Sequence, residues 1–167
     1  GPSARNHPLQ HGFDRFYGVP EGGGVYFYPF FQDNRSVVLD SLPTQPDSMF
    51  YSTDAFNDKA VQFIEEQEGS GKPFFLYVAH IAPHFPLQAW PADIARYRGQ
   101  YSDGFESVRD ARFREMKALG IVPQETALSP PDEKVQEWDS LPEADRDTLD
   151  LKMATYAAMI ERMDMGI

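Results

Sequence analysis

The alternation of apolar and polar positions divides the chain into three stretches with different expected structures. Residues 1–50 carry many aromatic, glycine and proline residues without a sustained period, so we expect loops with a small hairpin turning at Asp33–Asn34. Residues 51–90 change to a helical pattern followed by a continuous apolar run, and the pattern of residues 91–167 predicts helices joined by a proline-rich connection. Helix and buried strand in succession are typical of an α/β fold.

The middle stretch predicts a helix and then a buried strand. Thr53 is a candidate N-cap for the helix. The run PFFLYVAH, residues 73–80, has no polar alternation, which is typical of a central strand buried on both faces of a sheet. Open α/β sheets place their ligands at the carboxyl ends of strands, so we expect the site in the loop after residue 80. The apolar face of the helix is made of Phe56, Ala60, Phe63 and Ile64.

The last stretch predicts three helices. Pro91 begins a short helix over residues 91–97, and Gly120 closes a second helix within residues 102–120. Ser140 and Glu143 have the spacing of a capping box, which predicts the start of a third helix. Because its pattern continues to the last residue without a cap, we expect the chain to be a piece of a longer protein. The apolar stripe of this helix is Leu149, Met153, Tyr156, Ile160 and Met163.

Composition narrows the classes of function. The chain has 26 acidic and 15 basic residues and a net charge of -11, so we expect neither a nucleic acid nor an anionic membrane surface as a partner. A small anionic substrate remains compatible, because it responds to local groups. The absence of cysteine removes thiolate nucleophiles and cysteine-based zinc sites. No apolar run reaches the roughly 18 residues that a membrane-spanning helix needs.

The candidate chemistry lies in VAHIAPHFPLQAW, residues 78–90. Pro83 and Pro86 flank His84 and are expected to present its imidazole on a stiff loop. Histidine can donate a hydrogen bond to an anion and can protonate a leaving group near neutral pH. The alternative is a loop histidine that only hydrogen-bonds to backbone. His80 closes the apolar run, and we expect it to be structural and hydrogen-bonded. We do not expect a zinc site, because no further ligand stands at a recognisable spacing.

Four segments together resemble the sulfatase family, in its arylsulfatase branch. They are PLQHGFDRFYG, FYSTDAFNDKAVQFI, KPFFLYVAHIAPHFPLQAW and ATYAAMIERMDMGI, in that order along nearly the whole chain. The resemblance implies an alkaline-phosphatase-like α/β fold, here part of a mixed sheet flanked by helices and incomplete at both ends. It also implies hydrolysis of sulfate monoesters by a formylglycine nucleophile and a divalent metal, usually calcium. His84 matches the family histidine that holds the ester oxygen and helps to protonate the departing alcohol.

The chain also departs from the family pattern. It contains no Cys/Ser-x-Pro-x-Arg motif, from which formylglycine is made, and it lacks the Asp and Asn metal ligands that the family carries at both ends of the domain. We therefore expect residues 1–167 to be the central portion of a sulfatase catalytic domain. Within it, residues 1–50 are a loop and hairpin excursion, 51–90 a helix, strand and site loop, and 91–167 a helical region.

These departures set the expected partners. We expect a small-molecule sulfate ester and the rest of the sulfatase domain as partners, no cofactor within this chain, and calcium in the full-length enzyme. The chain by itself is expected to be inactive. Two alternatives stay open: a fragment of a related phosphatase or phosphodiesterase, and an acidic interaction module without catalysis.

Overall fold

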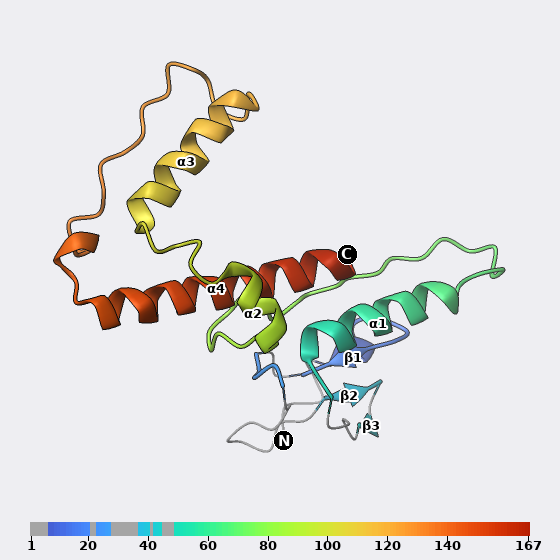
Figure 1. The fold of residues 1–167 in the computed structure, drawn as a ribbon. Coiled ribbons are helices and arrows are strands. Elements are labelled where there is room, and N and C mark those ends of the chain that lie inside the picture. The colour runs from blue at the N-terminus through green and yellow to red at the C-terminus, as the bar shows by residue number, and fades with distance from the viewer. Residues whose placement is uncertain (1–6, 21–22, 28–36, 41, 45–48) are drawn as a thin grey trace. The chain divides into compact units, whose positions relative to one another are not determined.

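The chain is divided into two compact units. The computed structural model describes residues 7–20, 23–27, 37–40, 42–44 and 49–167. The first unit is Gly1–Ala89 with Met159–Ile167, and the second is Trp90–Ala158. Figure 1 shows the helices and strands that build them.

The first unit contains a small antiparallel sheet. Strands β1 (Tyr17–Gly18), β2 (Val38–Leu39) and β3 (Leu42–Pro43) pair in that order, after the short 3-10 helix η2 (Pro8–Gln10). Helix α1 (Ser52–Glu65) lies against β1 (Figure 1), where the rings of Tyr17 and Phe56 meet edge to face at 5.9 Å. The predicted hairpin turn at Asp33–Asn34 lies outside the described residues.

Helix α1 begins one residue before the predicted cap. Its N-cap is Tyr51, whose carbonyl oxygen accepts the amide hydrogen of Ala55 at 3.0 Å. Thr53 is a buried residue of the first turn, so the prediction that it caps the helix is wrong. Asp54, in the same turn, accepts two hydrogen bonds of 2.8 Å from the guanidinium of Arg162 near the end of helix α4 (Glu143–Gly166). The first unit therefore joins segments far apart in the sequence.

The predicted strand over residues 73–80 is wrong. The described residues form no strand there, and Figure 1 draws the segment after α1 as extended coil. The rings of Phe75 and Tyr77 are 77% and 70% exposed. A strand needs neighbours to pair its amide and carbonyl groups, and the described strands pair only with one another. The expected mixed sheet is therefore not seen, and the described chain is mostly helical with one small sheet.

The second unit is helical, as predicted. Helix α2 (Pro91–Tyr97) has Pro91 in its first turn and the predicted bounds, because proline fits a position whose amide needs no partner. Helix α3 (Phe105–Ala118) is closed by Gly120 at φ 69°, which confirms the predicted end. The amides of Gly120 and Ile121 donate to the carbonyls of Lys117 and Met116, which satisfies the last turn.

The start of helix α4 differs from the predicted capping box. Ser140 ends the 3-10 helix η3 (Trp138–Ser140), and its hydroxyl donates to the carbonyl of Glu137 at 2.6 Å rather than capping α4. Further along α4, the buried carboxylate of Asp150 accepts the amides of Gly99 and Tyr101 and pairs with Arg98. This cluster holds the chain after α2 on α4. None of the described helices is long and apolar enough to cross a membrane.

Candidate functional site

His84 lies on a tight loop with its side chain exposed. The amide of His84 donates to the carbonyl of Ile81 at 2.9 Å, which closes a turn. His84 itself lies between Pro83 and Pro86. Ala82 and Ala89 are 7% and 6% exposed, so both ends of the loop are buried while its centre faces outward. The loop thus has the predicted form although the strand expected to precede it is absent.

One nitrogen of the His84 ring has a backbone partner. Nδ1 lies 2.6 Å from the carbonyl oxygen of Phe85. A carbonyl oxygen only accepts, so Nδ1 carries the hydrogen in this geometry and Nε2 is the nitrogen left to interact with a ligand. Nε2 accepts a hydrogen bond when the ring is neutral and donates one when the ring is an imidazolium. The alternative of a histidine that only hydrogen-bonds to backbone therefore accounts for Nδ1 but not for Nε2.

Two tyrosines from other parts of the first unit hold this loop, one of them through the loop residue Gln88. The phenol of Tyr26 donates to the carbonyl oxygen of His84 at 2.7 Å. The backbone amide of Tyr26 donates to the side-chain oxygen of Gln88 at 2.9 Å, and the phenol of Tyr51 donates to the Gln88 carbonyl at 2.8 Å. Both tyrosine rings are almost fully buried and stack with centroids 5.7 Å apart. The loop is consequently fixed at its centre, at the carbonyl of His84, and near its end, at Gln88.

Sequence reasoning missed these three residues. Tyr26 stands 58 positions before His84, and Tyr51 37 positions before Gln88. No period or motif links positions so far apart. The one signal present is compositional, since the aromatic-rich segment around Tyr26 directly follows a run of glycines.

Burial keeps the Tyr26 phenol protonated. Desolvation, and then the neighbouring Tyr51, raise the pKa of Tyr26 above its ordinary value. A phenol with a raised pKa remains a hydrogen-bond donor over the whole physiological range. Titration of the phenol therefore does not remove the donor to the His84 carbonyl in that range.

His80 is shielded but has no hydrogen bond among the described residues. Both of its ring nitrogens are inaccessible to solvent and lack a partner there. Burial lowers the pKa of His80, because the charged imidazolium loses its hydration. The prediction of a structural position agrees with this shielding, whereas the expected hydrogen bond is not formed.

No metal site is present in the part of the chain that the structure describes. No three side chains of His, Cys, Asp or Glu come close enough there to hold an ion. Two acidic side chains are instead engaged with other groups, Asp54 with the guanidinium of Arg162 and Asp150 with the amide of Gly99. The calcium implied by the family resemblance does not fit the described residues.

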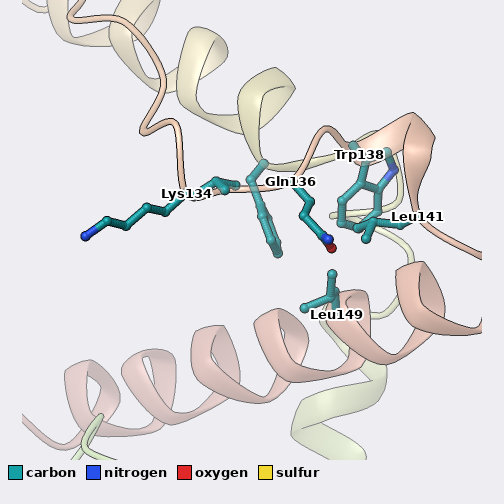
Figure 2. Close-up of a pocket in the computed structure, with 7 residues that line it drawn as sticks. Lys134, Gln136, Trp138, Leu141 and Leu149 are labelled. Atoms are coloured by element: carbon teal, nitrogen blue, oxygen red, sulfur yellow. The ribbon is translucent and has the colours of Figure 1, made fainter.

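The second unit contains an open pocket of about 370 Å³. Figure 2 shows Leu149 of α4 facing Gln136 and Trp138 across it. Its lining is mostly apolar, with Lys134 as the one ionisable group, and it includes no histidine. The remaining lining residues are Phe105, Val135 and Leu141. Because Lys134 is its one ionisable group, the pocket does not bring a pair of acid–base groups together.

Comparison with known proteins decides the family. A family model described as Sulfatase matches residues 2–167. The chain belongs to the sulfatase family. An uncharacterized sulfatase of Schizosaccharomyces pombe is 30% identical to it over 179 residues, covering 100% of this chain and 32% of that protein. An arylsulfatase of Klebsiella aerogenes is 40% identical over 151 residues, covering 89% of this chain and 30% of that protein.

A solved structure shares the fold of this chain. This sulfatase chain superposes on the crystal structure of Ps i-CgsB in complex with k-i-k-neocarrahexaose with a TM-score of 0.59 and 23% identity. The match covers 99% of this chain and 29% of that one. The chain therefore corresponds to part of a sulfatase fold, and it spans about a third of the length of the two sulfatases named above.

Proposed function

We propose that this chain supplies the leaving-group side of a site that hydrolyses sulfate monoesters. The observation that carries the proposal is the exposed ring of His84, held on a loop with Nδ1 occupied and Nε2 available. The sulfatase match over residues 2–167 gives the class of substrate, a sulfate ester. The relative named as an arylsulfatase, 40% identical, makes an aryl sulfate the first substrate to test.

His84 would act at the oxygen that joins sulfur to the alcohol. As an imidazolium, its Nε2–H donates a hydrogen bond to that bridging oxygen. When the S–O bond breaks, the electron pair goes to the oxygen, and the proton of Nε2 neutralises the departing alkoxide or phenoxide. The ring is then neutral, with its hydrogen still on Nδ1 and bonded to the Phe85 carbonyl.

The other parts of this site lie outside the described residues. The chain contains no Cys/Ser-x-Pro-x-Arg motif, so the nucleophile would come from sequence beyond these 167 residues. The exposed apolar side chains at 74–78 would be covered by the rest of the sulfatase domain, because matched relatives are about three times longer. We accordingly expect the isolated chain to be inactive and the full-length gene product to be the enzyme.

The test compares leaving groups in the full-length gene product. His84→Ala should lower kcat for phenyl sulfate by at least about tenfold, as expected for loss of a general acid. The loss should be smaller for 4-nitrophenyl sulfate, because its phenoxide departs without needing a proton. His11→Ala, at an exposed histidine outside the loop, is the matched control and should leave both rates unchanged.

Two results would contradict the proposal. Unchanged kinetics in His84→Ala would remove the histidine from catalysis. Faster hydrolysis of 4-nitrophenyl phosphate than of 4-nitrophenyl sulfate by the unmodified protein would point to a phosphatase or phosphodiesterase of the same superfamily.

A further inference from the structure

We infer that Tyr26 is a positioning residue for His84, because its buried phenol fixes the peptide group from which the imidazole is oriented. The inference rests on the proposed function of His84. Tyr26 has 0% exposure, so it cannot touch a substrate and must act through the loop. Its role would be to hold the ring ready rather than to bind the ester.

The position of the Tyr26 phenol is determined by several independent contacts. Its backbone amide donates to Gln88 at 2.9 Å, and its backbone carbonyl accepts the amide of Ser52 at 2.8 Å. Its ring stacks on Tyr51 at 5.7 Å. Because its backbone and ring are held, the hydroxyl is fixed in position, and there it donates to the His84 carbonyl at 2.7 Å.

The contact reaches the imidazole through two consecutive peptide groups. The His84 carbonyl and the Phe85 amide share one plane, so the Tyr26 hydroxyl fixes the orientation of that plane. The next carbonyl, that of Phe85, is the partner of the His84 Nδ1 at 2.6 Å. Rotation of the first plane would move this acceptor, and the ring would lose the contact that holds Nδ1.

The first test is Tyr26→Phe in the full-length gene product, which removes only the hydroxyl. We expect kcat for phenyl sulfate to fall about tenfold while KM stays within about twofold, because a misoriented acid slows the reaction without weakening substrate binding. In the background of His84→Ala, the same substitution should change kcat by less than about twofold, since a residue acting through His84 has nothing left to position. Losses that multiply in the double variant would overturn the inference.

Tyr51→Phe is the matched control. It removes an equally buried hydroxyl that also donates to a backbone carbonyl, at Gln88 instead of His84. We expect it to lower the melting temperature as much as Tyr26→Phe does and to keep kcat within about twofold of the unmodified value. Equal loss of kcat in both variants would make Tyr26 a general anchor of the loop and would overturn its specific role.

A second variant tests the inference if Tyr26→Phe folds poorly, and a spectroscopic measurement tests it without any enzymatic activity. Gln88→Leu keeps the Tyr26 hydroxyl but removes the acceptor of the Tyr26 backbone amide, so the phenol is held less firmly. It should lower kcat about threefold, and this loss should again not add to that of His84→Ala. In the 167-residue chain, ¹⁵N spectra of the histidine rings should show His84 protonated on Nδ1, and Tyr26→Phe should give a mixture of both tautomers.

The two readouts separate failure of the inference from failure of the proposed function. Unchanged kcat in His84→Ala together with a changed tautomer in Tyr26→Phe would contradict the catalytic role of His84 but support its positioning by Tyr26. A strong effect of His84→Ala with unchanged tautomer and kcat in Tyr26→Phe would sink the positioning alone.

Discussion

Two neighbouring segments of the chain, residues 73–80 and 81–90, differ sharply in how they are held. The first is extended and exposes its large rings, with Phe75 at 77% and Tyr77 at 70%. The second is fixed by hydrogen bonds from Tyr26 and Tyr51, both buried. The site loop therefore has its hydrogen-bond partners within this chain, whereas the apolar run before it pairs with no strand among the described residues.

The difference follows from the kind of interaction each segment needs. A loop can be fixed by a few side-chain donors, and two tyrosines and one glutamine provide them here. A strand needs a backbone neighbour along its whole length, since each unpaired amide or carbonyl that leaves water carries a cost. The same chain can therefore fix the orientation of His84 while leaving the preceding run without a sheet.

The largest expected effect is on the free energy of unfolding, when a tyrosine that holds the second segment and a tyrosine within the first are each replaced by alanine. Tyr51→Ala should lower the free energy of unfolding by about 3–5 kcal/mol, because it empties a buried aromatic site and removes an anchor of the loop. Tyr77→Ala, at an exposed ring, should change it by less than about 0.5 kcal/mol. Urea unfolding of the 167-residue chain measures both, and equal costs would break the contrast between the segments.

Sequence reasoning succeeded where structure is decided locally. Pro91 and Gly120 marked helix ends correctly, because a proline in the first turn and a left-handed glycine act within a few residues. Ser140 shows the limit, since it ends the 3-10 helix η3 and its hydroxyl donates to the carbonyl of Glu137 instead of accepting an amide of α4. The loop carrying His84 was predicted for the same local reason, from the prolines on both sides.

It failed where distant segments decide. The apolar run at 73–80 has the composition of a central strand, but composition cannot show whether a neighbour is present. Likewise, nothing in the sequence ties Tyr26 to His84 across 58 positions. The catalytic candidate could be found from the sequence and a family resemblance, but the residues that orient it could not.

A smaller effect should appear at the exposed rings of the first segment. Phe75→Lys should reduce binding of a dye that reports exposed apolar surface and reduce self-association of the isolated chain, with little change in its stability. In the full-length gene product, the same substitution should be destabilising, because neighbouring strands would bury the lysine. Equal behaviour of Phe75→Lys in both proteins would mean that the rest of the domain does not cover this segment.

The smallest expected effect is a pH dependence at the junction of the two segments. Burial lowers the pKa of His80 in the folded chain, so below its ordinary value of about 6.5 the unfolded chain binds a proton that the folded chain resists. Stability should therefore be complete above that value and decline as the pH falls below it. Melting temperatures of the 167-residue chain at about pH 7.5 and about pH 5.5 measure the decline, in a range above the ordinary titration of carboxylates.

His80→Leu is the variant that isolates this effect, because the other three histidines remain in both proteins. The leucine places no unpartnered ring nitrogen in the shielded position, so the melting temperature should fall less between the two pH values than it does with histidine. An identical fall in both proteins would mean that His80 is solvated or paired in solution. In that case the boundary between the segment with exposed side chains and the loop held by hydrogen bonds would lie after residue 80 rather than at it.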